Sequence, residues 1–190
     1  MIMKLTSLIC AAALLAGTTF TRSEETPSPA GMMPKPVAQH EWLKKFVGEW
    51  EMTTECHMEP DKPPVKGGGT ETVRSLGGFW IIADGKGEMM GSKAEYLMTL
   101  GFDPATGNYI GTWVDSMTGL LWKYTGSVDE TGKILTLESE GPSPMNPEKT
   151  TKYRDVTEFK SDDHRVFTSS MLGEDGKWVT LARGEAKRTK

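Results

Sequence analysis

The side chains of this chain that are best suited to hold a small molecule are aromatic. The 190 residues include 12 methionines and six tryptophans, at positions 42, 50, 80, 113, 122 and 178. Rings that line a cavity hold flat or acyl ligands through contact area and ring electrostatics, and methionine adapts to irregular shapes. We therefore expect Trp50, Trp80, Tyr96 and Trp113 to contact a small apolar ligand. The alternative is that the rings fill a closed core.

Two arginines could receive an acidic ligand group. Arg74 stands next to Val73, and Arg154 stands between Tyr153 and Asp155. An arginine that points into a ligand site can bind a carboxylate through two parallel hydrogen bonds. Arg74 and Arg154 are therefore candidate ligand-binding residues. The alternative for each is an outward position in an ion pair with a glutamate of a neighbouring strand.

Catalytic and metal-binding patterns are weak in this sequence. Neither G-x-S-x-G nor H-E-x-x-H occurs, and the three histidines are scattered. Cys56 with Met58 could hold Cu(I) as a thiolate and a thioether, and His164 could serve as a haem ligand, but a buried apolar cysteine and a solvated histidine explain them more simply. We predict no catalytic residue, no metal and no cofactor.

Composition and charge exclude several classes of protein. Hydrophobic residues make up 37% and charged residues 25% of the chain, which is ordinary for a globular protein and unlike a multi-span membrane protein. The net charge is 22 − 26 = −4. Because nucleic-acid-binding proteins usually carry a concentrated basic face, we expect no nucleic-acid partner.

The first residues have the layout of a secretory signal peptide. Lys4 precedes an uncharged, mostly apolar run from residue 5 to residue 20, which is too short and interrupted to span a membrane. We predict a signal peptide over residues 1–20 and a periplasmic or secreted protein. Cys10 lies too early in the run for a lipoprotein, so no stable membrane anchor is expected. Loss of the signal leaves Cys56 alone, without a disulfide partner.

Three segments follow from composition and periodicity. Residues 21–38 are rich in proline and predict a disordered linker, and residues 39–190 predict one domain. Within it, residues 40–47 show helical spacing, with Trp42 and Phe46 four residues apart, and Gly48 ends the helix. Alternation then predicts a strand over 50–58 and nine more over 70–76, 79–88, 94–102, 109–115, 120–128, 134–140, 151–159, 165–172 and 178–187. Residues 67–69, three glycines, are expected in a flexible loop.

Short links rich in glycine and aspartate predict hairpins between these strands. A run of ten hairpin-connected strands is an antiparallel meander, and closing it removes the unpaired edges. We therefore predict an all-β, antiparallel up-and-down barrel of about ten strands, with the short helix plugging one mouth. The alternative architecture is a two-sheet sandwich.

The chain also resembles a known family. The segment Gly48-Glu49-Trp50 after a helix is similar to the opening of lipocalins and fatty-acid-binding proteins, the calycins. Further motifs resemble the bacterial family known as domain of unknown function 1579, over residues 40–187: ETVRSLGGFW (71–80), MTLGFDP (98–104), GTW (111–113), YRD (153–155) and MLGEDG (171–176). The resemblance implies a calycin-like barrel and no particular activity. In lipocalins the corresponding tryptophan stacks on a basic side chain near the chain's end, for which Arg183 and Arg188 are the candidates.

Three functions remain open on the sequence. The first is a binding protein that holds a small hydrophobic or amphipathic ligand in its lumen. The second is an enzyme, which predicts an inward cluster of Arg, Asp or Glu with perturbed pKa values. The third is a structural protein with a solid core whose outer face binds a partner or forms a homodimer, which predicts an exposed apolar patch.

Overall fold

The computed structural model describes residues 33–57, 62–144 and 146–190. Residues 36–190 form one compact unit, and the fold described below is that of this unit. The predicted signal peptide, residues 1–20, lies outside the described residues, as does Met58. Within the predicted linker, the described part contains the start of the helix at Ala38.

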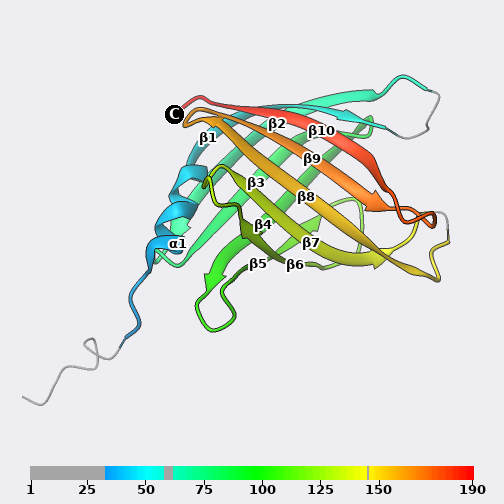
Figure 1. Cartoon of the computed structure of the whole chain (residues 1–190). Coiled ribbons are helices and arrows are strands. Elements are labelled where there is room, and N and C mark those ends of the chain that lie inside the picture. The colour runs from blue at the N-terminus through cyan, green and yellow to red at the C-terminus, as the bar shows by residue number, and fades with distance from the viewer. Residues whose placement is uncertain (1–32, 58–61, 145) are drawn as a thin grey trace, which may run out of the picture. The chain divides into compact units, whose positions relative to one another are not determined.

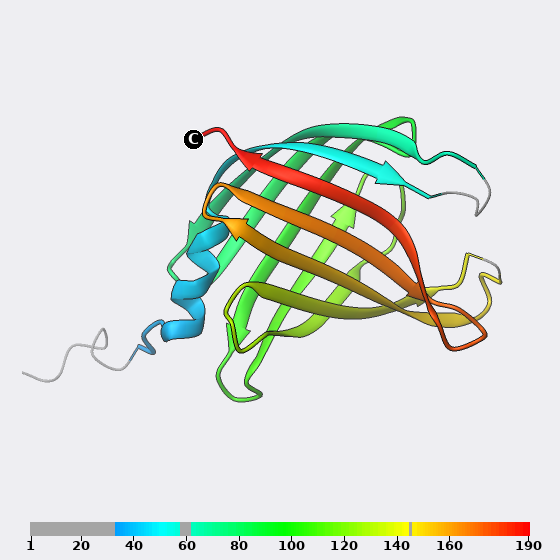
Figure 2. The ribbon, with the colours of Figure 1, turned by 45° about the horizontal axis from the view of Figure 1, so that its top comes forward.

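The described residues form ten antiparallel strands that close into a barrel (Figure 1). The strands are β1 Gly48–Cys56, β2 Val65–Leu76, β3 Trp80–Met89, β4 Ser92–Asp103, β5 Asn108–Asp115, β6 Trp122–Val128, β7 Ile134–Pro142, β8 Thr150–Ser161, β9 His164–Leu172 and β10 Trp178–Arg188. Each strand pairs with the next, and β10 pairs with β1 from Trp50↔Arg188 to Cys56↔Ala182. Figure 2 shows β10 running beside β1. The predicted ten-stranded barrel is confirmed, and the sandwich alternative is wrong.

Local turn chemistry fixes the hairpins. In the turn between β4 and β5, the carboxylate of Asp103 accepts hydrogen bonds from the Ala105 amide and the Thr106 hydroxyl, both at 2.9 Å. These hydrogen bonds lower the pKa of Asp103. Gly107 then takes φ +74°, a left-handed conformation that favours glycine, and the chain returns as β5.

The two-residue repeat of the strands decides what is inside. Side chains at alternate positions of every strand face the interior, as at Val73 in β2 and Leu100 in β4. The buried core lies at the end of the barrel where β1 begins. It comprises Leu43, Phe46, Trp50, Val73, Ile81, Ala83, Leu100, Tyr109, Tyr124, Leu135, Leu137, Phe159 and Ala186.

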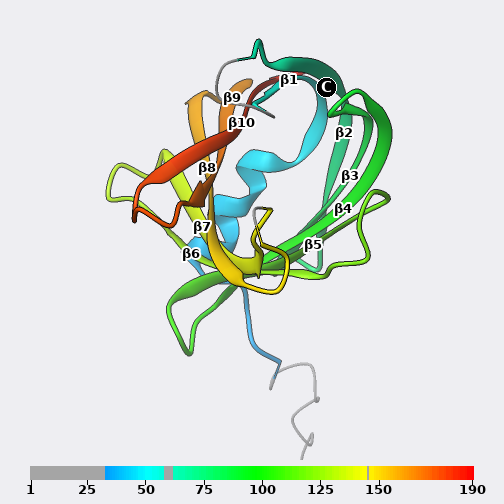
Figure 3. The same cartoon turned by 90° about the vertical axis from the view of Figure 1, so that its right-hand side faces the viewer.

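A short helical segment closes that end of the barrel. It consists of the α-helix α1 (Ala38–Trp42) and the 3₁₀ helix η2 (Leu43–Phe46). The predicted continuous helix to Val47 is wrong in its last turn. Because a 3₁₀ helix repeats every three residues, it brings Leu43 and Phe46 to the same side, and both are buried in the core. Figure 3 shows the helical segment across the ring of strands.

Residues 67–69 are not the predicted loop, because β2 begins at Val65 and includes them. Gly69 lies opposite Met52 of β1 and Gly87 of β3. A Cβ on Gly69 would lie 2.1 Å from the carbonyl oxygen of Lys86 and 2.7 Å from the Cα of Gly87. The glycines therefore allow neighbouring backbones to approach more closely than any side chain would permit.

Trp50 joins the helical segment to the last strand. Its side chain is 1% exposed, and its indole N–H donates to the carbonyl oxygen of Phe46 at 2.7 Å. The guanidinium carbon of Arg188 lies 4.2 Å from the centre of the Trp50 ring, and that of Arg165 lies 4.6 Å from it. Arg188 also donates hydrogen bonds to the carbonyl oxygens of Lys45, at 2.9 Å, and Val47.

The predicted partner of the tryptophan is therefore Arg188. Arg183, the other candidate, is exposed and stands opposite Glu55 on the outer face of β10. Stacking of an arginine on an indole is worth about 0.5–2 kcal/mol, with the larger values for desolvated pairs. Arg188 also donates hydrogen bonds to carbonyl groups that would otherwise have no partner at the end of the helical segment.

Replacement of Arg188 by alanine should lower the free energy of unfolding by about 2–4 kcal/mol, because it removes the stack on Trp50 and charged hydrogen bonds to η2. Urea denaturation followed by tryptophan fluorescence measures the loss. Arg183→Ala is the matched control, since it removes an exposed arginine from the same strand and should change stability by less than about 0.5 kcal/mol. Equal losses in the two variants would contradict this account of Arg188.

Candidate functional site

A buried ion pair crosses the interior of the barrel. Glu71 of β2 is 5% exposed, and the side chain of Arg165 of β9 is 12% exposed. Nη2 of Arg165 donates to Oε2 of Glu71. β1 and β10 separate the two strands in the sheet, so the pair spans the inner surface of those strands. Arg165 at the same time lies over the ring of Trp50, which places the ion pair directly above the sealed core.

Tyr96 of β4 extends this network. Its hydroxyl donates to Oε1 of Glu71 at 2.7 Å, and its ring stacks on Trp113 of β5 at 4.0 Å with 18° between the planes. Gly85 of β3 makes room for the ring, since a Cβ there would lie 2.1 Å from Tyr96 Cζ. Burial and the charge of Glu71 raise the pKa of Tyr96. The hydroxyl therefore stays protonated and acts as a hydrogen-bond donor.

A second polar pair lies on the wall made by β6 and β8. The hydroxyl of Tyr124 donates to Oδ2 of Asp155 at 2.8 Å. Burial raises the pKa of Asp155 and outweighs the hydrogen bonds from Ser169 and Tyr124, which lower it. The pKa of Tyr124 is also raised, by burial and by the charge of Asp155. This pair is thus held in an environment that disfavours negative charge.

Aromatic side chains surround these polar groups. Trp122 of β6 and Tyr153 of β8 meet edge to face, with ring centres 4.8 Å apart. Trp122 lies over Gly141 of β7, where a Cβ would come within 2.4 Å of the indole. The indole N–H of Trp113 donates to Oδ2 of Asp115 at 3.1 Å. These rings and carboxylates share the inner face of β5, β6 and β8.

The two ends of the barrel differ in how tightly the interior is sealed. Next to η2, the inward side chains are fully buried, as shown by Leu100 at 0% and Leu135 at 1% exposed. Farther from η2 the inward side chains are mixed. Some are buried, such as Cys56, Ala94 and Ser139, and others are half-buried: Met52, Trp113, Trp122, Tyr153, Phe167 and Met171. Part of the inner face in the half away from η2 is therefore less tightly sealed than the core.

Some polar atoms in this half have unused hydrogen-bonding capacity. Thr54 Oγ1, Asp155 Oδ1 and Arg165 Nε are buried, and none makes a well-formed hydrogen bond within the described part of the chain. The Ser169 hydroxyl is close enough to Asp155 to favour its charged form. Buried polar atoms without partners are rare in proteins and require an explanation.

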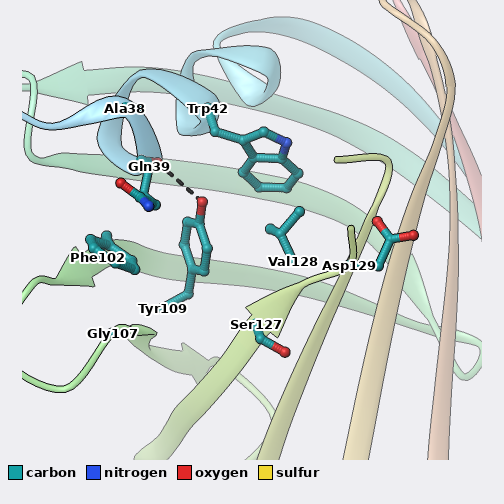
Figure 4. Close-up of a pocket in the computed structure, with 9 residues that line it drawn as sticks. All are labelled: Ala38, Gln39, Trp42, Phe102, Gly107, Tyr109, Ser127, Val128 and Asp129. Atoms are coloured by element: carbon teal, nitrogen blue, oxygen red, sulfur yellow. Dashed lines mark hydrogen bonds between the residues drawn. The ribbon is translucent and has the colours of Figure 1, made fainter. Parts of the chain in front are cut away.

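A separate groove lies beside α1 at the sealed end (Figure 4). It has a volume of about 430 Å³ and is lined from three sides by α1, the turn between β4 and β5, and the end of β6. The hydroxyl of Tyr109 donates across it to the carbonyl oxygen of Gln39 at 3.2 Å, and burial raises the pKa of Tyr109 to about 12. Trp42 and Val128 form its apolar side.

The profile of one protein family matches residues 35–188, and its description reads "Protein of unknown function (DUF1579)". The chain belongs to this family. The resemblance predicted from the sequence is thereby confirmed, including its extent over nearly the whole described barrel.

One solved structure has a similar fold, and others match more weakly. Rv2717c from M. tuberculosis is 12% identical, with 82% of this chain and 100% of Rv2717c covered and a TM-score of 0.59. A de novo designed fluorescence-activating beta barrel is 16% identical over 77% of this chain and 95% of that chain, with a TM-score of 0.42. EF1p2_mFAP2b bound to DFHBI is 14% identical over 79% and 98%, with a TM-score of 0.39. At these identities the likeness concerns the fold alone. No curated protein matches this DUF1579 chain.

The structure divides the six predicted ligand-binding residues of this DUF1579 barrel between its two faces. Trp50, Tyr96 and Trp113 face the interior. Trp50 lies wholly within the sealed core, where Arg165 and Arg188 cover its ring. Tyr96 is buried at 8% exposed and Trp113 is half-buried. Both belong to the network that begins at Glu71, because Tyr96 donates to Glu71 and stacks on Trp113.

The other three predicted residues lie on the outer face, so the expectation that they line the interior is wrong. Arg74 is exposed on β2, one position away from inward-facing Val73. Trp80 is 36% exposed and covers Gly101 of the neighbouring strand. Arg154 forms an ion pair with Glu138 of β7 at 2.7 Å, and its guanidinium carbon lies 4.0 Å from the centre of the Trp178 ring. The alternative of a cross-strand ion pair is thus confirmed for Arg154.

Sequence reasoning missed the charged residues of the interior, Glu71, Asp155 and Arg165. A usable signal was present in the alternation of the strands. Glu71 is two residues from Val73, and Arg165 is two residues from Phe167, so each shares a face with an apolar side chain. A charged residue an even number of positions from the buried apolar residues of its strand is expected to face inward. Arg74 is one position from Val73 and is therefore expected to face outward.

The outer face of this DUF1579 barrel carries an exposed apolar row. Leu97 of β4 is 48% exposed and pairs directly with Val114 of β5, which is 40% exposed. Leu121, just before β6, is 49% exposed. No part of the described chain covers these side chains, and the homodimer stays a prediction.

Within the described part of the chain, no group of three or more His, Cys, Asp or Glu side chains is placed to hold a metal ion. No helix in the described ranges is long and apolar enough to cross a membrane.

The raised pKa of Asp155 predicts how stability depends on pH. Because the folded-state pKa lies above its ordinary value of 3.8, the folded protein loses stability as the pH rises from about 3.8 through the raised pKa. Asp155→Asn keeps an acceptor for Tyr124 but cannot ionise. We therefore expect the stability of this variant, relative to wild type, to increase as the pH rises from 3.8.

Chemical denaturation at several pH values between about 4 and 8 measures this difference, and the comparison of the two proteins removes the contribution of groups that they share. Tyr124→Phe provides a second check. Loss of the hydroxyl removes a hydrogen bond that favours the ionised carboxylate, so the pKa of Asp155 should rise further in an NMR titration. A stability difference between wild type and Asp155→Asn that does not change with pH would show that burial does not penalise this charge.

Proposed function

We propose that this barrel binds one small, partly apolar molecule in the half of its interior away from η2. The supporting observation is that half-buried aromatic and methionine side chains meet buried polar groups with unused hydrogen-bonding capacity on one inner surface. Small-molecule sites typically combine predominantly apolar walls with a few placed polar groups.

The apolar part of the proposed site comes from Trp113, Trp122, Tyr153, Phe167 and Met171. They stand on four strands, β5, β6, β8 and β9, which lie within one consecutive half of the barrel, so they line one curved wall of the interior. Ring contacts already hold several of them in place: Trp113 against Tyr96, and Trp122 against Tyr153. Walls that are fixed before binding lose little side-chain entropy when a ligand arrives.

The polar part supplies orientation. The hydroxyls of Tyr96 and Tyr124 remain protonated because their pKa values are raised. Thr54 Oγ1 is buried and makes no well-formed hydrogen bond within the described residues, so a ligand that displaces its neighbours would find a hydroxyl to pair with. A ligand that leaves these groups unpaired would bind less well, since each unpaired buried group costs about 1–3 kcal/mol.

Binding explains the interior better than catalysis. The enzyme alternative required an inward cluster of charged residues with perturbed pKa values; Glu71, Arg165 and Asp155 face inward, and the pKa of Asp155 is raised. However, Glu71 already accepts from both Arg165 and Tyr96, and Asp155 accepts from Tyr124. Both carboxylates are thus already engaged by groups of the barrel itself.

The cellular compartment in which the protein would bind its ligand follows from its first residues. The predicted signal peptide over residues 1–20 directs the chain out of the cytoplasm. We therefore propose a periplasmic or secreted binding protein.

Replacement of Trp113 by alanine should weaken binding of the neutral dye Nile red about tenfold, because a large ring is lost from the proposed site. The measurement is a fluorescence titration of the purified protein. Trp80→Ala is the matched control: it removes a tryptophan from the outer face and should leave the dissociation constant unchanged.

A third variant separates the interior from the groove beside α1. Ser127→Trp places a large side chain in that groove and should not affect the dye. If Ser127→Trp abolishes binding and Trp113→Ala does not, the ligand site is the groove. If the wild-type protein binds no Nile red at all, the proposed function fails.

A further inference from the structure

The charges that face the interior restrict the kind of molecule that can bind there. This inference rests on the proposed function and concerns the half of the barrel away from η2. Three carboxylates face inward in that half, Glu71 on β2, Asp115 on β5 and Asp155 on β8. Two arginines of the strands also face the interior: Arg188, which is held by the carbonyl oxygens of Lys45 and Val47, and Arg165.

Arg165 is not free to receive an acidic ligand. Its Nη2 donates to Glu71, whose other oxygen accepts from Tyr96. Both members of the pair are almost fully buried, so their charges compensate each other at short range. A ligand carboxylate could bind Arg165 only by displacing Glu71, which would leave a buried carboxylate without its counter-charge at a cost of several kcal/mol.

Asp115 and Asp155 are left without an inward cation of their own in the described part of the barrel. Tyr124 connects them, since its hydroxyl donates to Asp155 and the charge of Asp115 contributes to its raised pKa. Asp115 accepts hydrogen bonds from Trp113 and from the amides of Met117 and Thr118. These neutral donors stabilise its charge without cancelling it, so the wall of β5, β6 and β8 keeps a negative potential.

The state of Asp155 is an independent sign that a positive group is missing. Its Oδ1 is buried and makes no well-formed hydrogen bond within the described residues, and the groups that favour its charged form, Ser169 and Tyr124, are neutral hydroxyls. A buried carboxylate is stable in its charged form only when it is paired. A bound cation would supply that pair, and an anion or a neutral ligand would not.

The walls around these carboxylates suit a cation as well. Aromatic rings have a negative face that attracts ammonium groups, and rings of this kind are the usual receptors for quaternary ammonium ions. Trp113 shares β5 with Asp115, Tyr153 shares β8 with Asp155, and Trp122 and Tyr124 stand on β6, one of the two strands between them. Met171 on β9, also half-buried and inward-facing, offers an apolar surface for the remainder of a ligand.

We propose that the barrel selects a small amphipathic organic cation, an amine or a quaternary ammonium compound, whose charged group lies in the field of Asp115 and Asp155 and against the aromatic side chains of Trp113 and Trp122. This assignment replaces the expectation of a carboxylate ligand, which depended on Arg74 and Arg154. Both arginines lie on the outer face, and the inward Arg165 is paired with Glu71.

Three probes with the same ten-carbon tail test the assignment: decyltrimethylammonium, 1-decanol and decyl sulfonate. Each is titrated, below its aggregation concentration, against the wild-type protein loaded with Nile red. We expect the cation to displace the dye with an affinity about tenfold or more above that of decanol, and the anion to bind weakest. This ranking needs no variant and so does not depend on whether a substitution folds.

Asp155→Asn then tests the source of the selectivity. It should bring the affinity for decyltrimethylammonium close to that for decanol, while the affinity for decanol stays unchanged. Asp162→Asn is the matched control, because it makes the same change in net charge on an exposed turn and should leave the ranking intact.

The outcomes separate this inference from the proposed function. Equal affinities for the three probes, or tightest binding of the sulfonate, would overturn the cation assignment while the Trp113→Ala result still supports a ligand site. Equal weakening by Asp155→Asn and Asp162→Asn would show that overall charge, and not the interior, selects the cation. If no probe and no dye binds, both proposals fail together.

Discussion

The stack of Arg188, Trp50 and Arg165 is the contact on which the rest of the barrel depends. One arginine comes from the last strand and holds the carbonyl groups at the end of η2, so the helical segment stays over the mouth. The other arginine covers the second approach to the indole and carries Glu71, which in turn receives Tyr96. A single buried indole therefore links the closure of the barrel between β1 and β10 to the polar layer above the core. Loss of either arginine would expose a different neighbour: the helical segment for Arg188, and the carboxylate of Glu71 for Arg165.

This arrangement gives the barrel two unlike ends. At the helical end, Leu43 and Phe46 enter from η2 and complete a core of apolar side chains. At the other end, glycines replace side chains on the inner faces of β2 and β3, so that the backbones approach each other and the ring of Tyr96 lies flat on Gly85. Aromatic rings and carboxylates face the interior in this half. Stability is thus concentrated at one end, and groups that are costly to bury gather at the other, as is common where a site and a scaffold share one domain.

The alternation of apolar and polar residues made the barrel predictable. It was not used to decide whether each charged side chain faces the interior or the solvent. Where large apolar side chains alternate clearly with polar ones, as at Trp50 and Met52 in β1, burial of the apolar face sets the register with which β1 pairs with β10 and closes the sheet. Arg74 was expected inside because an arginine suits a carboxylate, although its phase relative to Val73 put it outside; the phase was the better guide. Residues 67–69 were expected in a loop because glycine weakens a strand, and the reason they form one, the close backbone of Gly87, lies on a strand distant in sequence. The pairing of Glu71 with Arg165 likewise joins residues 94 positions apart, which no local pattern can reveal.

Asp155 is the residue whose presence stability alone does not explain. Its burial raises its pKa, which means that the folded protein holds this carboxylate at a cost whenever it is ionised. Leu137 and Ser169 stand opposite it on the two neighbouring strands, so neither β7 nor β9 supplies a cation. An asparagine would keep the hydrogen bond from Tyr124 without that cost. Side chains that destabilise the folded state in this way are concentrated at functional sites, where binding of a ligand offsets the destabilisation. The hydrogen-bonding neighbours of Asp155, Tyr124 and Ser169, are neutral, and Arg165 is paired with Glu71. A positive charge would therefore relieve this carboxylate most, and for that reason the chemistry of the interior points to the charge of its ligand more directly than the fold does.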